Sequence, residues 1–137
     1  MLTEGAGVPI GVAVGGANVH DQKLVKETFQ SIPVRRPQPK PRKRQHLCAD
    51  KGYDADTVRQ EAKRRRYIAH IPKKGESAST SKRRGAKARR WVVERTHSWI
   101  NRARRLLIRW EKKVANYLGF LHLQFAITTL RAAKVLG

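Results

Sequence analysis

The spacing of apolar and polar positions in the first third of the chain predicts a hairpin followed by a helix. Residues 8–17 are small and apolar with glycines near both ends, a pattern typical of a strand. Residues 2–3 precede a glycine-rich turn and predict the other strand of the hairpin. Apolar residues then recur at helical spacing after Asp21, whose carboxylate is expected to cap a helix that runs to about Ser31. The chain is therefore expected to begin within a sheet.

Residues 33–45 interrupt this pattern, because four prolines alternate there with six basic residues. Proline at this density prevents regular secondary structure, so the segment is predicted to be an extended basic linker within one domain. Two interpretations stay open at this point. The segment is either a solvated connector or an arm that contacts phosphate groups, since positive charge alone supplies non-specific affinity for a polyanion.

Two further apolar runs, at residues 46–49 and 67–72, each predict a short strand. Between them, Asp54 or Asp56 is expected to cap a helix that runs to about Arg65. Strands that alternate with helices in this way predict an α/β domain with a mixed sheet.

The last third of the chain has a helical period. From residue 87 onward apolar positions recur every three or four residues, with a break expected near residues 111–115, so two C-terminal helices are predicted. Residues 73–86, rich in glycine, serine and lysine, are expected to be mobile. One apolar stripe on the first helix is predicted to face the core, and it consists of Val92, Thr96, Trp99, Ala103, Leu106 and Trp110.

Charge changes the picture more than any other property of the composition. The chain has 31 Lys and Arg against 10 Asp and Glu, a net charge of +21. Self-repulsion on this scale opposes folding unless a polyanion is bound, so nucleic acid is the expected partner. An anionic membrane is the competing partner, but it would favour basic residues on one amphipathic helix, whereas here they recur all along the chain. Other basic proteins, such as ribosomal ones, remain open on composition.

The cysteine content and the N-terminal sequence favour a cytoplasmic protein. The single cysteine, Cys48, excludes an internal disulfide, fits a reducing compartment, and is expected to be a small buried apolar side chain. Polar residues interrupt the apolar stretch at 114–136, so no membrane span is expected. The N-terminus lacks the pattern of a secretory signal.

Glu94 is a single acid in a column of basic and polar residues on the predicted helix. At about 100° per residue, the positions seven before, four before and seven after it share one narrow sector. These positions hold Lys87, Arg90 and Asn101, and His97 and Ser98 flank the sector. One interpretation is a surface ion pair between Arg90 and Glu94 worth about 0.3 kcal/mol.

Asp50 supports a second interpretation, a metal site. It follows a short apolar strand, at the edge where α/β sheets place their ligands, and Gly52 permits a tight turn there. A carboxylate from a strand end and one from a packed helix can converge on a divalent cation. Mg²⁺ needs only one or two carboxylates and completes its shell with water and substrate phosphate. A basic surface around such an acidic centre would draw DNA towards it.

Several motifs occur together in an order that resembles the DDE transposases of bacterial insertion sequences, in the insertion-sequence-five branch. They are Gly5-Ala6-Gly7-Val8-Pro9-Ile10-Gly11, Gly16-Ala17-Asn18-Val19-His20-Asp21, Ala49-Asp50-Lys51-Gly52-Tyr53-Asp54, Arg90-Trp91-Val92-Val93-Glu94-Arg95-Thr96 and Trp99-Ile100-Asn101-Arg102-Ala103-Arg104-Arg105-Leu106. The similarity covers nearly the whole chain, residues 1–137. It implies an RNase H-like fold, of which this chain would be an incomplete, C-terminal part.

The resemblance also implies the site. In this family three acids bind two Mg²⁺ ions, with Mn²⁺ as a substitute, and Asp50 matches the second acid and Glu94 the third. The family pattern around that glutamate is Tyr, two residues, Arg, three residues, Glu, six residues, Lys. Arg90 and Glu94 match it, whereas Lys87 and Asn101 depart from it. Contacts to DNA are expected from Arg90, His97, Asn101, Arg102 and Arg105.

The first acid would lie on a strand upstream of the hairpin, and Asp21 matches a different position. We therefore expect an upstream transposase polypeptide to supply it, and expect this chain alone to be inactive. The implied reaction is phosphodiester hydrolysis at the ends of an insertion sequence, followed by strand transfer to target DNA, with a homodimer at the synaptic stage. Two alternatives are an inactive transposase remnant that binds DNA through charge alone, and an unrelated basic module that binds nucleic acid.

Overall fold

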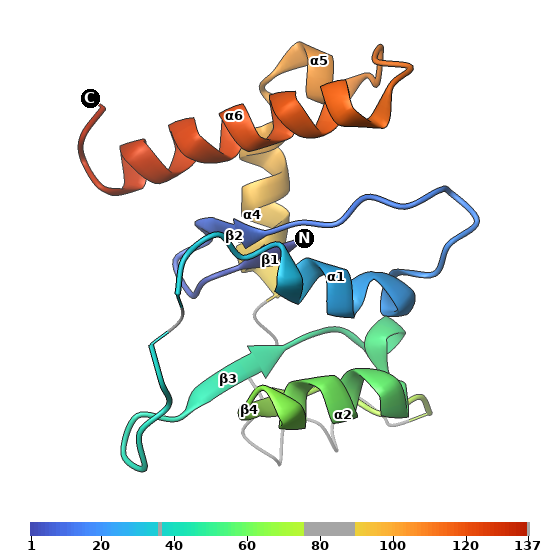
Figure 1. Ribbon diagram of the computed structural model, residues 1–137, viewed down its shortest axis with the longest axis vertical. Coiled ribbons are helices and arrows are strands. Elements are labelled where there is room, and N and C mark those ends of the chain that lie inside the picture. Colours follow the sequence, from blue (N-terminus) through green and yellow to red (C-terminus); the bar gives the residue numbers. More distant parts are fainter. Residues whose placement is uncertain (36, 76–89, 137) are drawn as a thin grey trace.

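A short antiparallel hairpin opens the fold in the computed structural model, which describes residues 1–35, 37–75 and 90–136 (Figure 1). Strand β1 (Leu2–Thr3) pairs with β2 (Pro9–Gly11). The Glu4 carboxylate closes the turn by accepting hydrogen bonds from the amides of Ala6 and Val8, at 2.8 and 2.9 Å. The predicted hairpin is confirmed. The predicted strand over residues 8–17 is shorter than expected, because the two residues of β1 offer it few backbone partners.

The helix predicted after the hairpin forms, but its beginning differs from the prediction. A 3-10 turn, η1 (Asp21–Leu24), leads into α1 (Val25–Gln30). The N-cap residue of the turn is His20, and no side chain caps either segment. The capping role expected of Asp21 is therefore wrong, because the residue lies inside the turn rather than before it.

A β–α–β unit follows. Strand β3 (Gln45–Cys48) pairs in parallel with β4 (Tyr67–His70), and α2 (Asp56–Arg64) connects them. Val58 and Ala62, one helical turn apart, are 2% and 0% exposed, so one face of α2 is fully buried. The N-cap of α2 is Ala55, which has no side-chain oxygen. The capping role expected of Asp54 or Asp56 is therefore wrong.

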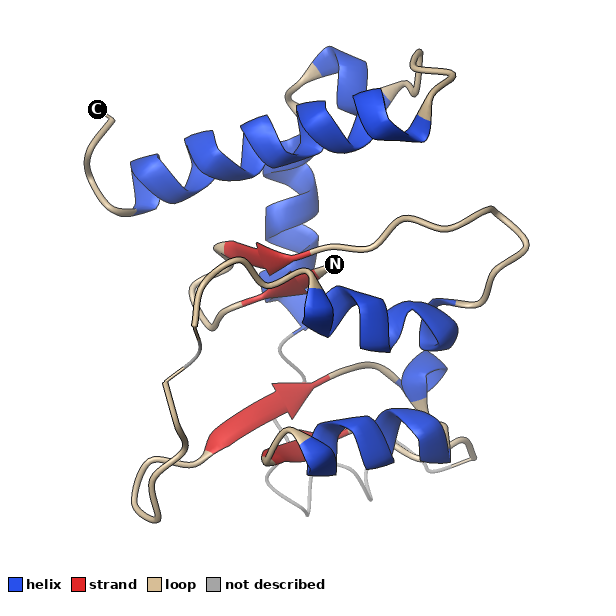
Figure 2. Cartoon of the chain, viewed as in Figure 1, coloured by secondary structure: helices blue, strands red, loops and turns tan. Residues whose placement is uncertain are grey.

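The described residues form two separate two-stranded sheets rather than the single mixed sheet that was predicted. Figure 2 shows α1 lying between the hairpin and the β3–α2–β4 unit. Phe29 of α1 packs in a cluster with Leu47 of β3 and Ala62 of α2, and Leu2 of the hairpin contacts the same cluster. A helix therefore occupies the place where further strand pairing would have joined the sheets. The mixture of helices and strands, an α/β class, is as predicted.

Three helices, not two, make up the described C-terminal part: α4 (Arg90–Asn101), α5 (Arg104–Leu107) and α6 (Val114–Ala132). The predicted break near residues 111–115 is confirmed, because no helix spans the residues between α5 and α6, but the first helix also ends earlier, after Asn101. This earlier end lets Leu106 of α5 join a cluster with Ile100 and Leu121. Figure 1 shows α6 crossing the end of α4. Val92, Thr96 and Leu106 of the predicted stripe are buried, but Trp110 is 73% exposed because it lies beyond the break.

The remaining expectations concern Cys48, the proline-rich segment, residues 73–87 and a membrane span. Cys48 is exposed, not buried, because side chains alternate along β3 and Leu47 takes the inward position. The segment before β3 contains no helix or named strand in its described residues, as its prolines predict. Most of the segment predicted to be mobile, and the predicted helix start at Lys87, lie outside the described residues. No helix in the described part of the chain is long and apolar enough to cross a membrane.

Candidate active site

Asp50 stands directly after β3, at the carboxyl edge of the parallel pair. It is the N-cap residue of a 3-10 turn, η2 (Lys51–Tyr53), and its Oδ1 accepts a hydrogen bond from the Gly52 amide at 2.9 Å. A Cβ on Gly52 would lie 2.9 Å from that same oxygen, so any larger residue there would displace the Asp50 carboxylate. The Gln22 side-chain amide donates to the Gly52 carbonyl and ties the turn to η1. In the described part of the chain, no side chain or amide binds Asp50 Oδ2.

The Tyr53 phenol interacts electrostatically with Asp50 and with a second carboxylate, Asp21. Burial raises the pKa of the Tyr53 phenol, and the negative charges of Asp21 and Asp50 raise it further. Coulomb effects of this kind act over short range, so both carboxylates lie near the phenol. The sequence motif contains Tyr53, but its interaction with two acids could not be inferred from the sequence. Asp21 belongs to a different segment, 29 positions before Asp50.

Asp54 is not available as a metal ligand, because both oxygens of its carboxylate already have hydrogen-bond partners. Its Oδ1 pairs with Arg59 at 2.6 Å, and its Oδ2 accepts a hydrogen bond from the Lys74 amide at 2.8 Å. The hydrogen bond from Arg59 is the first cause that lowers the pKa of Asp54. Arg59 also donates to the Ile71 carbonyl at 3.0 Å, so the pair fixes the end of α2 to the chain after β4. This acid has a structural role, and Asp50 is left as the carboxylate with an oxygen that no described residue binds.

Helix α4 is anchored to the hairpin turn through residues next to Glu94. The Thr96 hydroxyl is fully buried, 2.6 Å from the Gly7 carbonyl and 3.0 Å from the Val92 carbonyl. Arg95 donates to the Ala6 carbonyl, and its guanidinium lies over the rings of two tryptophans of the same helix. Gly7 has a φ of +89°, and a Cβ there would be 3.0 Å from the Arg95 guanidinium, so glycine permits the close approach. The helix is thereby fixed in rotation.

Glu94 itself faces outward on this fixed helix and is exposed. His97 lies one turn further on, and burial together with the nearby positive amine of Met1 lowers the pKa of its imidazole. The Met1 amine also interacts with Asp21. No hydrogen bond or ion pair joins Asp50 to Glu94 in the described part of the chain.

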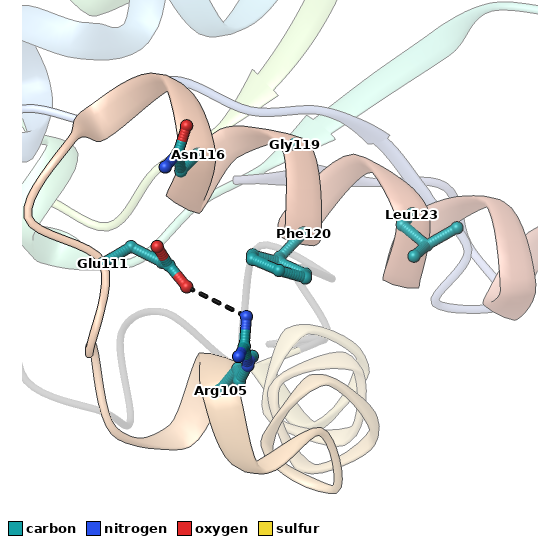
Figure 3. A pocket seen from close by; sticks show the side chains of 6 residues that line it. All are labelled: Arg105, Glu111, Asn116, Gly119, Phe120 and Leu123. Carbon is teal, nitrogen blue, oxygen red and sulfur yellow. Dashed lines mark hydrogen bonds and ion pairs between the residues drawn. The ribbon is translucent and has the colours of Figure 1, made fainter.

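The residues expected to contact DNA differ in their surroundings. Asn101 and Arg102 are exposed at the end of α4, and the side chain of Arg90 lies outside what the structure describes. Arg105 is engaged: it pairs with Glu111 at 3.3 Å and lies 5.0 Å from the centre of the Phe120 ring (Figure 3). Phosphate binding by Arg105 would compete with this pair. Within the described residues, no group of three or more His, Cys, Asp and Glu side chains is close enough to hold a metal ion.

Two comparisons with known proteins bear on this arrangement. A model of the transposase DDE domain matches residues 47–131, which is more than half of the chain and includes both Asp50 and Glu94. The chain belongs to the DDE transposase family. A protein named as the transposase for insertion sequence element IS402, from Burkholderia cepacia, is 35% identical over 138 residues, covering 97% of this chain. The chain spans 64% of the length of that relative. No solved structure matches the chain.

Membership of this transposase family explains the mixture of features at the site. An insertion-sequence transposase acts in DNA transposition, and DDE domains use divalent metal ions. The matched region includes one acid directly after a strand, Asp50, and one on the outward face of an anchored helix, Glu94. The family match agrees with the resemblance that the sequence motifs indicated.

Proposed function

We propose that this chain is the C-terminal part of the catalytic domain of an insertion-sequence transposase, with an RNase H-like fold. It would use a divalent metal for phosphodiester hydrolysis at the element ends and for strand transfer into target DNA. The motifs favour the insertion-sequence-five branch. The observation that carries the proposal is the place of Asp50. It follows β3 in a turn where it accepts a hydrogen bond from the Gly52 amide, inside a region that matches the transposase DDE domain.

The donor atoms at this site suit a hard divalent cation. Asp50 and Glu94 each offer carboxylate oxygens. Mg²⁺ or Mn²⁺ would be held by Asp50 and Glu94, with water and DNA phosphate completing the shell. Bound there, such a cation supplies Lewis-acid stabilisation of a phosphate oxygen and activates the attacking hydroxyl. The resemblance implies one more acid, the first of the family's three, which the proposal assigns to an upstream transposase polypeptide.

The protein's own side chains attract and orient the DNA. A net charge of +21 draws the duplex to a surface whose acids alone would repel it. Exposed Asn101 and Arg102 at the end of α4, together with Arg90 and His97, would contact phosphates beside the scissile bond. Desolvation and the positive amine of Met1 lower the pKa of the His97 imidazole, which favours a role as a hydrogen-bonding group over a role as a cation. Arg105 would join them only after leaving Glu111.

Nicking of an element-end duplex tests the proposal. The chain is combined with the upstream polypeptide and assayed with Mg²⁺, Mn²⁺ or a chelator. Asp50→Asn and Glu94→Gln are each expected to reduce nicking at least about 100-fold, the scale of losing one transition-state contact of roughly 3 kcal/mol. Glu27→Gln is the matched control, because Glu27 is exposed on α1 and lies outside the sequence motifs that contain Asp50 and Glu94. Nicking that survives both site substitutions would overturn the proposal.

The inactive-remnant alternative shares the basic surface and makes a different prediction. It requires binding of duplex DNA that is unaffected by Mg²⁺ and by Asp50→Asn, with no nicking even in the presence of the upstream polypeptide. Mn²⁺ binding to the chain, followed by electron paramagnetic resonance, separates the two further. Loss of Mn²⁺ binding in Asp50→Asn supports the catalytic proposal, whereas unchanged binding favours the remnant.

A further inference from the structure

A cation-lined hollow lies at the amino edge of the parallel sheet, away from Asp50. Its volume is about 400 Å³, and its walls come from the proline-rich basic segment, the end of α2 and the beginning of β4. It is lined by Pro39, Lys40, Pro41, Arg44, Lys63, Arg66, Tyr67 and Ile68. Four of these eight residues are cationic and none is acidic.

The four cations keep their charge uncompensated in the described part of the chain, where none of them forms an ion pair. The nearest acid along α2 is Glu61, but its Oε1 is already bound to Arg64 at 3.1 Å and to Arg65 at 2.7 Å. Four like charges around one hollow repel one another, so the arrangement is stabilised when an anion enters it.

The hollow is held in shape by the backbone. In the basic segment, the Lys43 amide donates to the Lys40 carbonyl at 2.9 Å, and the Gln45 side chain donates to the Pro37 carbonyl at 2.9 Å. On the opposite wall, Arg66 has a φ of 59°, a conformation that costs a non-glycine residue about 1 kcal/mol. The basic segment is thus folded against the end of α2, which favours the phosphate-contacting arm over the solvated connector.

The position of the hollow makes it separate from the candidate active site. Strand β3 runs from the basic segment to the turn that holds Asp50 (Figure 1). At about 3.3 Å per residue, its four residues separate the two places by roughly 13 Å. That distance corresponds to about four base pairs along a duplex at roughly 3.4 Å each. One DNA duplex can therefore reach both places.

We propose that this hollow is a second DNA-binding site, which holds a backbone phosphate of the duplex a few base pairs from the reacting bond. The ligand is a phosphate group, and the contacts carry no base specificity, since the cations bind the phosphate and not the edges of the bases. The choice of DNA as the polyanion rests on the proposed function. The site itself rests on the hollow, its four cations and its ordered walls.

The test removes two charges with little cost to the fold. Arg66→Asn suits the positive φ, because asparagine tolerates it, and Lys63→Gln keeps the helix propensity of the last turn of α2. Lys26→Gln with Lys134→Asn is the matched control: Lys26 is an exposed helix residue, and Lys134 has a φ of 58°. Both double variants lose two positive charges, so the effect of net charge is the same in each. Circular dichroism verifies that both are folded.

Fluorescence anisotropy with a labelled duplex, over a series of salt concentrations, measures the contacts. Each phosphate contact contributes about 0.9 to the slope of log K against log salt. The Lys63→Gln/Arg66→Asn variant is expected to lower the slope by about 2 and to weaken binding several tens of times near 0.1 M salt. An equal slope in this variant and the control would overturn the proposal. So would a loss of binding to single-stranded RNA that leaves duplex binding unchanged.

Asp50→Asn in the same binding assay separates this inference from the proposed function. It is expected to leave the salt slope of duplex binding unchanged in a chelator, while nicking is lost. A failure of nicking in the unmodified protein would count against the proposed function alone, because the anisotropy measurement does not depend on catalysis.

Discussion

Thr96→Val tests whether the hairpin turn fixes the helix that bears Glu94. The substitution keeps the shape of the side chain and removes a hydroxyl that is fully buried and 2.6 Å from the Gly7 carbonyl. Gly7 is itself buried, so its carbonyl loses its side-chain donor in a place that water does not reach freely. An unsatisfied buried acceptor costs about 1–3 kcal/mol, and the added methyl group recovers part of this. The net loss of unfolding free energy is expected to be about 1.5 kcal/mol.

Thermal unfolding followed by circular dichroism measures this loss. An unfolding entropy of about 2.1 cal/mol/K per residue gives roughly 290 cal/mol/K for a chain of this size, so Tm should fall by about 5 °C. Thr128→Val is the matched control. Thr128 is also buried on a helix, and its hydroxyl bonds only to the carbonyl one turn back, at 2.9 Å from Gln124. Its removal should shift Tm by about 1 °C or less.

Equal shifts in the two variants would refute the reasoning, because the bond to the hairpin would then contribute nothing beyond the local helical bond. A second readout concerns function. If the anchor orients Glu94, Thr96→Val should also reduce nicking in the completed transposase at temperatures well below its Tm. Full activity with reduced stability would show that the anchor stabilises the fold without orienting the acid.

Three further predictions concern the turn after β3. Gly52→Ala places a Cβ 2.9 Å from Asp50 Oδ1, so Mn²⁺ affinity measured by electron paramagnetic resonance should fall about tenfold; unchanged affinity would contradict the metal role of Asp50. Tyr53 should ionise above its ordinary pKa of 10.0 in a spectrophotometric titration, and Asp50→Asn should lower that pKa. An unchanged pKa of Tyr53 in Asp50→Asn would contradict the electrostatic interaction between the two side chains. The pKa of Asp54 is held below its ordinary 3.8, so its stabilising effect is present above that pH and is lost as pH falls through the folded value. Asp54→Asn should therefore lower Tm at pH 7 but not near pH 2, and a difference that persists in acid would contradict this.

The sequence by itself determined the local elements and the family. Alternation and turn residues predicted the hairpin and both strands of the parallel pair, because these depend on neighbours in the chain. The sequence also predicted a site at Asp50 and Glu94, since a strand end and a helical column are local patterns. The matching transposase DDE domain agrees with the motifs around them.

Only the tertiary structure decided features that depend on distant contacts. The helix ends at Asn101 because Leu106 joins a cluster with Leu121, which no local pattern predicts. The turn of Asp50 is held by Gln22, and the acids beside Tyr53 come from separate segments.

The basic segment before β3 shows the same division. Its composition predicted an affinity for phosphate but left a connector and an arm equally open. The structure folds it against Lys63 and Arg66 at the end of α2, and so forms a hollow lined by four cations. Charge is fixed by the sequence, but the concentration of charge in one place depends on which segments pack together. That packing is set by the burial of residues far apart in the chain.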